Sequence, residues 1–132
     1  MVVMGIDYGE KNIGLAFGIN NLVSPLRIIS GKNDETAINE IARLALENKV
    51  KRLVIGIPLT YENKETIQAI KIRRFAKLLK IKLKIPVVFV NEYRTSEETM
   101  EEAIELDVSK KKRKRIDDLS AALILKKYFQ AA

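Results

Sequence analysis

Five mainly apolar runs of strand length are distributed along the 132-residue chain. Each run is four or five residues long and ends at a turn-forming or acidic residue, as is typical of buried β-strands. The runs occupy residues 2–6, 13–17, 26–29, 53–57 and 87–90. A short segment that contains Gly9 separates the first two runs, which favours a β-hairpin.

Apolar residues at helical spacing predict four helices between and after these strands. The helices cover residues 34–48, 64–83, 95–106 and 117–129, with Asp34 as the expected N-cap of the first. Three strands in succession, followed by alternating helices and strands, predict an α/β fold with one mixed sheet and helices on its faces. The length suits a single domain, which we expect to span 1–132.

The chain contains neither histidine nor cysteine. Their absence excludes a cysteine nucleophile, a disulfide framework, a Cys/His zinc site, a Ser-His-Asp triad and a histidine general base. Any catalysis must therefore use carboxylates, hydroxyls, lysine, arginine, or a metal ion held by oxygen ligands.

Lysine and arginine outnumber aspartate and glutamate by 24 to 17, which gives a formal net charge of +7. A basic surplus favours a polyanionic partner such as nucleic acid. One dense basic run follows an acidic block at 92–107 and consists of Lys110, Lys111, Lys112, Arg113, Lys114 and Arg115. This run is a solvated loop, a flexible arm that neutralises phosphates, or both. Lys11, in the first turn, is likewise either a solvated tip or a phosphate contact.

No apolar stretch approaches the roughly 20 residues that are needed to span a bilayer. The first residues also lack the pattern of a secretory signal, namely a basic start, an apolar core and a small-residue cleavage site. We therefore expect a cytoplasmic protein with no membrane partner.

Three carboxylates stand at the ends of predicted elements. Asp7 follows the first apolar run, Glu92 follows the last one, and Asp117 begins the last helix. Because sites in open α/β sheets gather at strand ends, these carboxylates are candidates for one site. Converging carboxylates repel one another unless they are protonated or share a cation. The set therefore favours a hard-oxygen site for Mg²⁺ or Mn²⁺, and two such ions suit phosphodiester hydrolysis.

Each carboxylate also has a purely structural interpretation. Asp7 can satisfy backbone donors in its turn, and Glu92 can pair with Arg94. Asp117 or Asp118 can simply cap the last helix. Taken singly, the structural interpretations are the simpler ones. Taken together, on a basic chain without other catalytic chemistry, the three carboxylates favour a metal-dependent site.

Four segments resemble, in order, the motifs of the YqgF/RuvX family. Residues 6–16 resemble the family's opening hairpin, and residues 54–59 resemble its Val-Gly-Leu-Pro-Leu strand. Residues 91–96 resemble its Asp-Glu-Arg-x-Thr-Ser/Thr segment, and residues 116–125 resemble its closing helix. The resemblance covers almost the whole chain. Members of this family are described as Holliday junction resolvases and as pre-16S rRNA nucleases.

The resemblance implies a ribonuclease H-like fold, with a central five-stranded mixed sheet of three antiparallel strands followed by parallel strands. It also implies that Asp7, Glu92 and Asp117 are the catalytic residues and the ligands of a two-metal site for Mg²⁺ or Mn²⁺. Asp118 is the alternative to Asp117 as the third acidic ligand.

Two positions depart from the family pattern. Asn91 stands where the family usually has aspartate, and Tyr93 stands where it has arginine. The arginine appears one place later as Arg94, which we list with Lys11 and residues 110–115 as expected nucleic-acid contacts. A shift of one place along a strand changes the face on which a side chain lies.

The leading hypothesis is a metal-dependent nuclease of structured nucleic acid, with the 5′ end of pre-16S rRNA as its first-choice substrate. The alternative is a resolvase of Holliday junctions in DNA recombination and repair, which needs a dimer that matches the symmetry of the junction. We expect a monomer or a weak homodimer. A non-catalytic RNA-binding ribosome-assembly factor is the competing class, since a fold does not fix a function.

Overall fold

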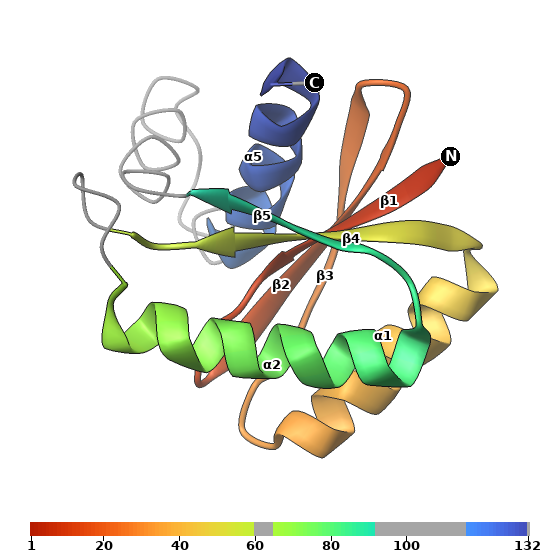
Figure 1. The fold of residues 1–132 in the computed structure, drawn as a ribbon. Coiled ribbons are helices and arrows are strands. Elements are labelled where there is room, and N and C mark those ends of the chain that lie inside the picture. Colours follow the sequence, from red (N-terminus) through yellow and green to blue (C-terminus); the bar gives the residue numbers. More distant parts are fainter. Residues whose placement is uncertain (60–64, 92–115, 132) are drawn as a thin grey trace.

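The computed structural model describes residues 1–59, 65–91 and 116–131 and contains one five-stranded sheet (Figure 1). The strands are β1 (Val2–Asp7), β2 (Asn12–Ile19), β3 (Leu22–Ser30), β4 (Val50–Ile57) and β5 (Val87–Asn91). Their order across the sheet is β3-β2-β1-β4-β5. The first three strands are antiparallel, whereas β4 and β5 continue the sheet parallel to β1. The predicted mixed sheet is confirmed.

Strands β2 and β3 are longer than the apolar runs that predicted them. They continue to a tight turn at Asn20 and Asn21, which both have positive φ, of 50° and 71°. Two left-handed residues in succession match the twist of a two-residue hairpin, and asparagine tolerates this conformation well. The turn therefore extends the hairpin beyond its buried part.

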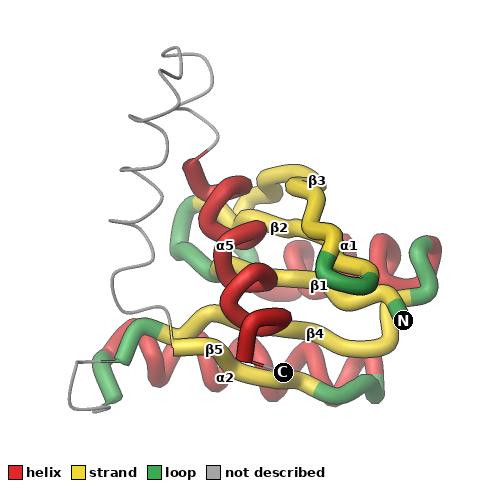
Figure 2. The backbone as a smooth tube through the Cα atoms, turned by 90° about the horizontal axis from the view of Figure 1, so that it is seen from above, coloured by secondary structure: helices red, strands yellow, loops and turns green. Residues whose placement is uncertain are grey.

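Helices cover both faces of the sheet. Helices α1 (Asp34–Glu47) and α2 (Ile67–Leu83) lie on one face, and α5 (Ile116–Ala131) lies on the other (Figures 1 and 2). The predicted helix over 95–106 lies outside the described residues. None of the described helices is long and apolar enough to cross a membrane.

The helix N-caps correct one prediction. Asn33, and not Asp34, caps α1, because its side-chain oxygen accepts a hydrogen bond of 2.9 Å from the backbone N–H of Thr36. Asp34 occupies the first turn, where a negative charge is favourable at the helix N-terminus. Thr66 caps α2 by accepting from the N–H of Ala69, so this helix begins later than the predicted residue 64.

Alternating side chains of the sheet fill two separate hydrophobic clusters. The larger cluster lies against α1 and α2 and includes Met4, Ile6, Leu15, Ile55 and Phe75. The smaller cluster lies against α5 and includes Val3, Ala16, Val54, Ile124 and Leu125. Odd-numbered residues of β1 therefore face α5, and even-numbered residues face the other two helices.

Helix α5 approaches the sheet closely over two glycines. A Cβ atom on Gly5 would lie 2.6 Å from Cγ of Leu125 and 2.9 Å from the carbonyl oxygen of Ala121. A Cβ atom on Gly18 would lie 2.6 Å from the ring of Phe129. Only residues without a side chain permit this distance between helix and sheet. The two glycines thus fix the position of α5 over β1 and β2.

Candidate active-site edge

Asp7 is the last residue of β1, near the middle of the sheet. It pairs in register with Gly14 of β2 and is half-buried. Val3 and Gly5 face α5, and residues two apart along a strand share a face. Asp7 therefore lies on the α5 side of the sheet, at the edge where the parallel strands end.

The first turn of α5 lies at this same edge. Phe129 contacts Gly18, which pairs with Val3, whereas Ala121 contacts Gly5. Helix α5 therefore starts toward the carboxyl end of β1, and it runs across the sheet toward the amino end of that strand. Position 117 precedes Ala121 by about 6 Å along the helix axis, at about 1.5 Å per residue. Asp7 lies about 7 Å beyond Gly5, at about 3.3 Å per residue.

The backbone thus brings two of the three predicted acidic positions, 7 and 117, to one edge of the sheet, with position 118 beside the latter. Glu92 lies outside the described residues, as do Arg94 and the basic run 110–115. Within the described ranges, no three acidic side chains gather into a group that could hold a metal ion.

Asn91 connects the end of β5 to the end of its parallel neighbour β4. It pairs in register with Ile57 at the end of β4. Its side-chain oxygen also accepts a hydrogen bond of 3.4 Å from the N–H of Leu59. This contact holds the segment after β4 against the end of β5, directly before position 92. Asn91 is one of the two positions that depart from the family pattern, and its contact with Leu59 was not predicted from the sequence.

Lys11 lies exposed in the turn between β1 and β2. Its carbonyl oxygen accepts a hydrogen bond of 2.8 Å from the N–H of Gly31, which fastens the turn to the end of β3. The turn backbone is therefore held in place beside Asp7, while the Lys11 side chain remains accessible to solvent.

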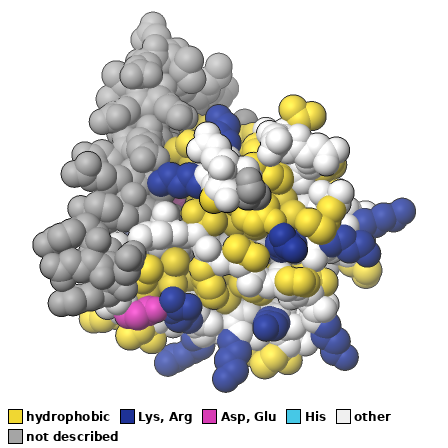
Figure 3. Space-filling model, turned by 45° about the horizontal axis from the view of Figure 1, so that its top comes forward, with side chains coloured by type: hydrophobic (Ala, Val, Ile, Leu, Met, Phe, Trp, Pro, Cys, Tyr) yellow, Lys and Arg dark blue, Asp and Glu magenta, His cyan; other side chains and the backbone are white. Residues whose placement is uncertain are grey.

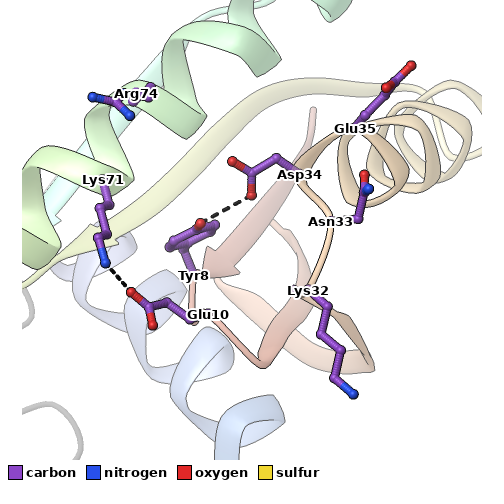
Figure 4. A pocket seen from close by; sticks show the side chains of 9 residues that line it. Tyr8, Glu10, Lys32, Asn33, Asp34, Glu35, Lys71 and Arg74 are labelled. Atoms are coloured by element: carbon purple, nitrogen blue, oxygen red, sulfur yellow. Dashed lines mark hydrogen bonds and ion pairs between the residues drawn. The ribbon is translucent and has the colours of Figure 1, made fainter.

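A polar pocket of about 600 Å³ lies at the same end of β1 but on the face of α1 and α2 (Figure 4). The Tyr8 hydroxyl donates a 3.2 Å hydrogen bond to Asp34 there, and Lys71 forms an ion pair with Glu10. The Tyr8 ring also packs on Phe75, with ring centroids 4.6 Å apart. This pocket was not predictable from the sequence, because its residues come from separate parts of the chain and share no local motif.

Two pKa values are shifted in this pocket. Burial raises the pKa of Tyr8 above its usual value, and the charge of Asp34 and the hydrogen bond to it act in the same direction. The hydrogen bond and the charge of Lys71 lower the pKa of Glu10. The pocket lining carries both signs of charge, and the bonds of Tyr8 to Asp34 and of Lys71 to Glu10 connect β1 and the turn after it to α1 and α2.

The family model described as "RuvX: Holliday junction resolvase" matches residues 1–131. The chain belongs to the RuvX family. A RuvX relative from Dictyoglomus thermophilum is 35% identical over 140 residues, which cover 100% of this chain and 97% of the relative. One from Chloroflexus aggregans is 36% identical over 132 residues, or 98% and 93% of the two chains. Both relatives carry the name "Putative pre-16S rRNA nuclease".

Solved structures share the fold of this RuvX chain. The RuvC protein of T. thermophilus in complex with a Holliday junction substrate matches with a TM-score of 0.64 at 14% identity, over 99% of this chain and 96% of that chain. The fowlpox virus resolvase in complex with junction DNA matches with a TM-score of 0.58 at 14% identity, over 98% and 99%. The predicted ribonuclease H-like fold is confirmed. The RuvX family consists of nucleases and resolvases, which hydrolyse phosphodiester bonds.

Proposed function

We propose that this RuvX protein is a metal-dependent nuclease that processes the 5′ end of pre-16S rRNA. The observation that carries the proposal is the placement of Asp7 at the carboxyl end of a central strand, on the side of the sheet where α5 begins. This is the edge at which α/β sheets build their sites. The names of the curated relatives support RNA as the substrate.

The proposed site comprises Asp7, Glu92 and Asp117, with Asp118 as the alternative third ligand. Val90, two positions before Glu92 in the sequence, belongs to the cluster on the α5 side of the sheet. This placement supports a common face for Asp7 and Glu92. A donor set of carboxylate oxygens without histidine or cysteine suits Mg²⁺ or Mn²⁺. Two such ions would polarise the phosphodiester and stabilise its leaving oxygen.

In this proposal the chain's own residues bind and orient the substrate. Lys11 contributes a cation beside Asp7 from a turn that Gly31 holds in place. Arg94 and the basic run 110–115 supply further cations, and neutralised phosphates release their counterions, which favours binding at low salt. The ends of β4 and β5, joined through Asn91, form a fixed support beside the acidic edge.

Resolution of Holliday junctions is the second candidate function. It is favoured by the description of the family model and by the junction complexes among the structures of similar fold. A junction has two strands to cut symmetrically, so this function requires two copies of the chain in a symmetric dimer. Analytical ultracentrifugation with and without junction DNA tests that requirement.

A cleavage assay with Mg²⁺ or Mn²⁺ tests the proposed function. The substrates are an RNA that carries the 16S leader and mature 5′ end, an unstructured single-stranded RNA, and a four-way DNA junction. Wild type is compared with Asp7→Asn and with Glu10→Gln, which alters an exposed carboxylate three residues away on the other side of the sheet. We expect cleavage of the leader RNA that is lost in Asp7→Asn and in EDTA but retained in Glu10→Gln.

Three outcomes would contradict the proposal. Cleavage of the junction alone favours the resolvase. Cleavage by Asp7→Asn at the wild-type rate refutes the acidic site. RNA binding without cleavage by any variant favours the non-catalytic assembly factor.

A further inference from the structure

Helix α2 and the segments that flank it carry the whole positive surplus of the chain. Residues 66–91 contain seven basic side chains and no acidic one, whereas the rest of the chain contains seventeen of each. The seven are Lys71, Arg73, Arg74, Lys77, Lys80, Lys82 and Lys84, and all are exposed. The buried positions of α2, such as Ile72 and Phe75, face the sheet. The described part of the protein therefore has a positively charged surface along α2.

A shallow groove of about 260 Å³ separates this helix from β5, which is an edge strand of the sheet. The groove is lined by Arg73, Ala76, Lys77, Lys80, Val87 and Phe89. Its floor is apolar, with Ala76 buried and Val87 and Phe89 half-buried, and its rim is cationic. In Figure 3, which shows one face of the molecule, Lys and Arg side chains far outnumber acidic ones among the described residues.

The groove contains a candidate stacking surface, formed by Arg73 over the ring of Phe89. The guanidinium carbon of Arg73 lies 4.9 Å from the centroid of the Phe89 ring, and Arg73 also pairs with Glu65. Both contacts restrain the guanidinium group. Guanidinium planes and aromatic rings are the two protein surfaces on which unpaired bases stack.

Two cations of the rim are available to a ligand. Neither Lys77 nor Lys80 forms an ion pair with any residue in the ranges 1–59, 65–91 and 116–131. They are three residues apart on α2, so they are neighbours along its surface. They thus stand beside the stacking surface as two positive charges that no described acidic residue neutralises.

We propose that this groove binds single-stranded nucleic acid, with one base on the Arg73–Phe89 pair and the adjoining phosphates on Lys77 and Lys80. A duplex hides the faces of its bases and would use only the cations. An acidic peptide would likewise leave the stacking surface unused. The groove therefore fits an unpaired strand better than either of these.

The groove lies away from the proposed catalytic edge. Val87 and Phe89 face α2, whereas Asp7 faces α5. The biological role of the groove rests on the proposed nuclease function, for which it would hold an unpaired segment that flanks the cleaved bond. Binding can nevertheless be measured without cleavage, so the two proposals fail separately.

Fluorescence anisotropy tests the groove in an Asp7→Asn background with EDTA, so that no strand is cut. The probes are a labelled single-stranded RNA 12-mer of mixed sequence, an RNA hairpin duplex and an oligoglutamate peptide. The test variants are Phe89→Leu, Arg73→Lys and the pair Lys77→Gln with Lys80→Gln. The pair Lys51→Gln with Lys126→Gln is the matched control, because it removes two exposed charges on other elements.

We expect Phe89→Leu and Arg73→Lys each to weaken single-strand binding at least about fivefold, the lower end of base-stacking contributions. The slope of log K against log salt should stay unchanged in these two variants. The double lysine variant should instead reduce that slope by about 1.4, since each phosphate contact on a single strand contributes about 0.7. At low salt, the control variant with Lys51→Gln and Lys126→Gln should bind the single strand more tightly than the variant with Lys77→Gln and Lys80→Gln.

Several results would overturn the inference. One is wild-type affinity of both Phe89→Leu and Arg73→Lys for the single strand. Another is equal weakening of duplex and single-strand binding by these two variants. Preferential binding of oligoglutamate, lost in the lysine variant, would assign the groove to an acidic protein partner. Arg73→Lys alters an exposed side chain, so it remains informative if Phe89→Leu fails to fold.

Discussion

Ala121 of α5 lies against Gly5 of β1 so closely that its carbonyl oxygen would be 2.9 Å from a Cβ atom at that position. Gly5→Ala should therefore push α5 away from the sheet and destabilise the protein by about 1–3 kcal/mol, the usual cost of overpacking. Because α5 begins at the sheet edge where Asp7 lies, the proposed cleavage activity should fall as well. Urea unfolding and the leader-RNA assay measure the two effects. Ser24→Ala, at an exposed position of β3, is the control and should change neither.

The hydrogen bond from Tyr8 to Asp34 should make the free energy of unfolding fall at alkaline pH, where Tyr8 loses its proton. Folding raises the pKa of Tyr8 above 10. The contribution of this hydrogen bond to the free energy of unfolding is therefore fully present below pH 10. It is lost as the pH rises through the folded-state pKa. Tyr8→Phe should cost about 1 kcal/mol near neutral pH. The stability difference between wild type and Tyr8→Phe in urea should shrink above pH 10, and a constant difference up to pH 12 would contradict this assignment.

The ion pair between Glu10 and Lys71 should be visible as a shifted titration. Lys71 lowers the pKa of Glu10 in the folded protein below the ordinary value of 4.5. Carbon-detected NMR should therefore find the Glu10 carboxyl titrating below that value, and Lys71→Met should restore it. The contribution of the pair to stability is present above about pH 4.5 and is lost as the pH falls through the lower pKa. An unchanged Glu10 titration in Lys71→Met would show that the pair does not form in solution.

Thr66 connects the end of β4 to the start of α2. Its hydroxyl accepts a 3.0 Å hydrogen bond from the N–H of Ala69 and donates one of 3.0 Å to the carbonyl of Pro58. Thr66→Ala should lower the free energy of unfolding by about 1 kcal/mol, the typical cost of losing an N-cap. Thr66→Ser keeps the hydroxyl and should recover most of that loss. Equal destabilisation by both variants would argue that the methyl group, and not the cap, matters.

Metal binding at the proposed site should stabilise the fold through Asp7. A cation that binds only the folded state raises its stability, and it relieves repulsion between neighbouring carboxylates. Mg²⁺ or Mn²⁺ should therefore raise the Tm of wild type and leave the Tm of Asp7→Asn unchanged. Differential scanning fluorimetry in EDTA and in millimolar metal measures this without any substrate. An equal rise in both proteins would place the metal elsewhere.

The strands were predictable because each is a short apolar run that ends at a turn residue. The mixed sheet followed from three strands in succession before the first helix. The N-cap of α1 was predicted wrongly at Asp34, since asparagine and aspartate cap equally well and only the contact of Asn33 with Thr36 decides between them. The placement of Asp7 at a strand end was also predictable, but its face depends on the packing of Val3 and Gly5 against α5.

Lys11, Arg94 and the run 110–115 were the nucleic-acid contacts predicted from the sequence, and the groove beside α2 was not among them. The available signal was the absence of any acidic residue between positions 66 and 91. The partnership of Arg73 with Phe89 could not be read from the sequence. It depends on β5 lying at the edge of the sheet next to α2, which is a property of the strand order.

The position of α5 along the chain has a consequence for synthesis. The sheet face of Val3, Ala16 and Val54 is covered by a helix that leaves the ribosome after every strand of the sheet has been made. The opposite face can close earlier, because α1 and α2 precede β5. Until α5 docks, the nascent protein exposes an apolar face beside Asp7 and lacks position 117. Under the proposed function, the nascent protein is thus inactive until α5 has been made and has docked on the sheet.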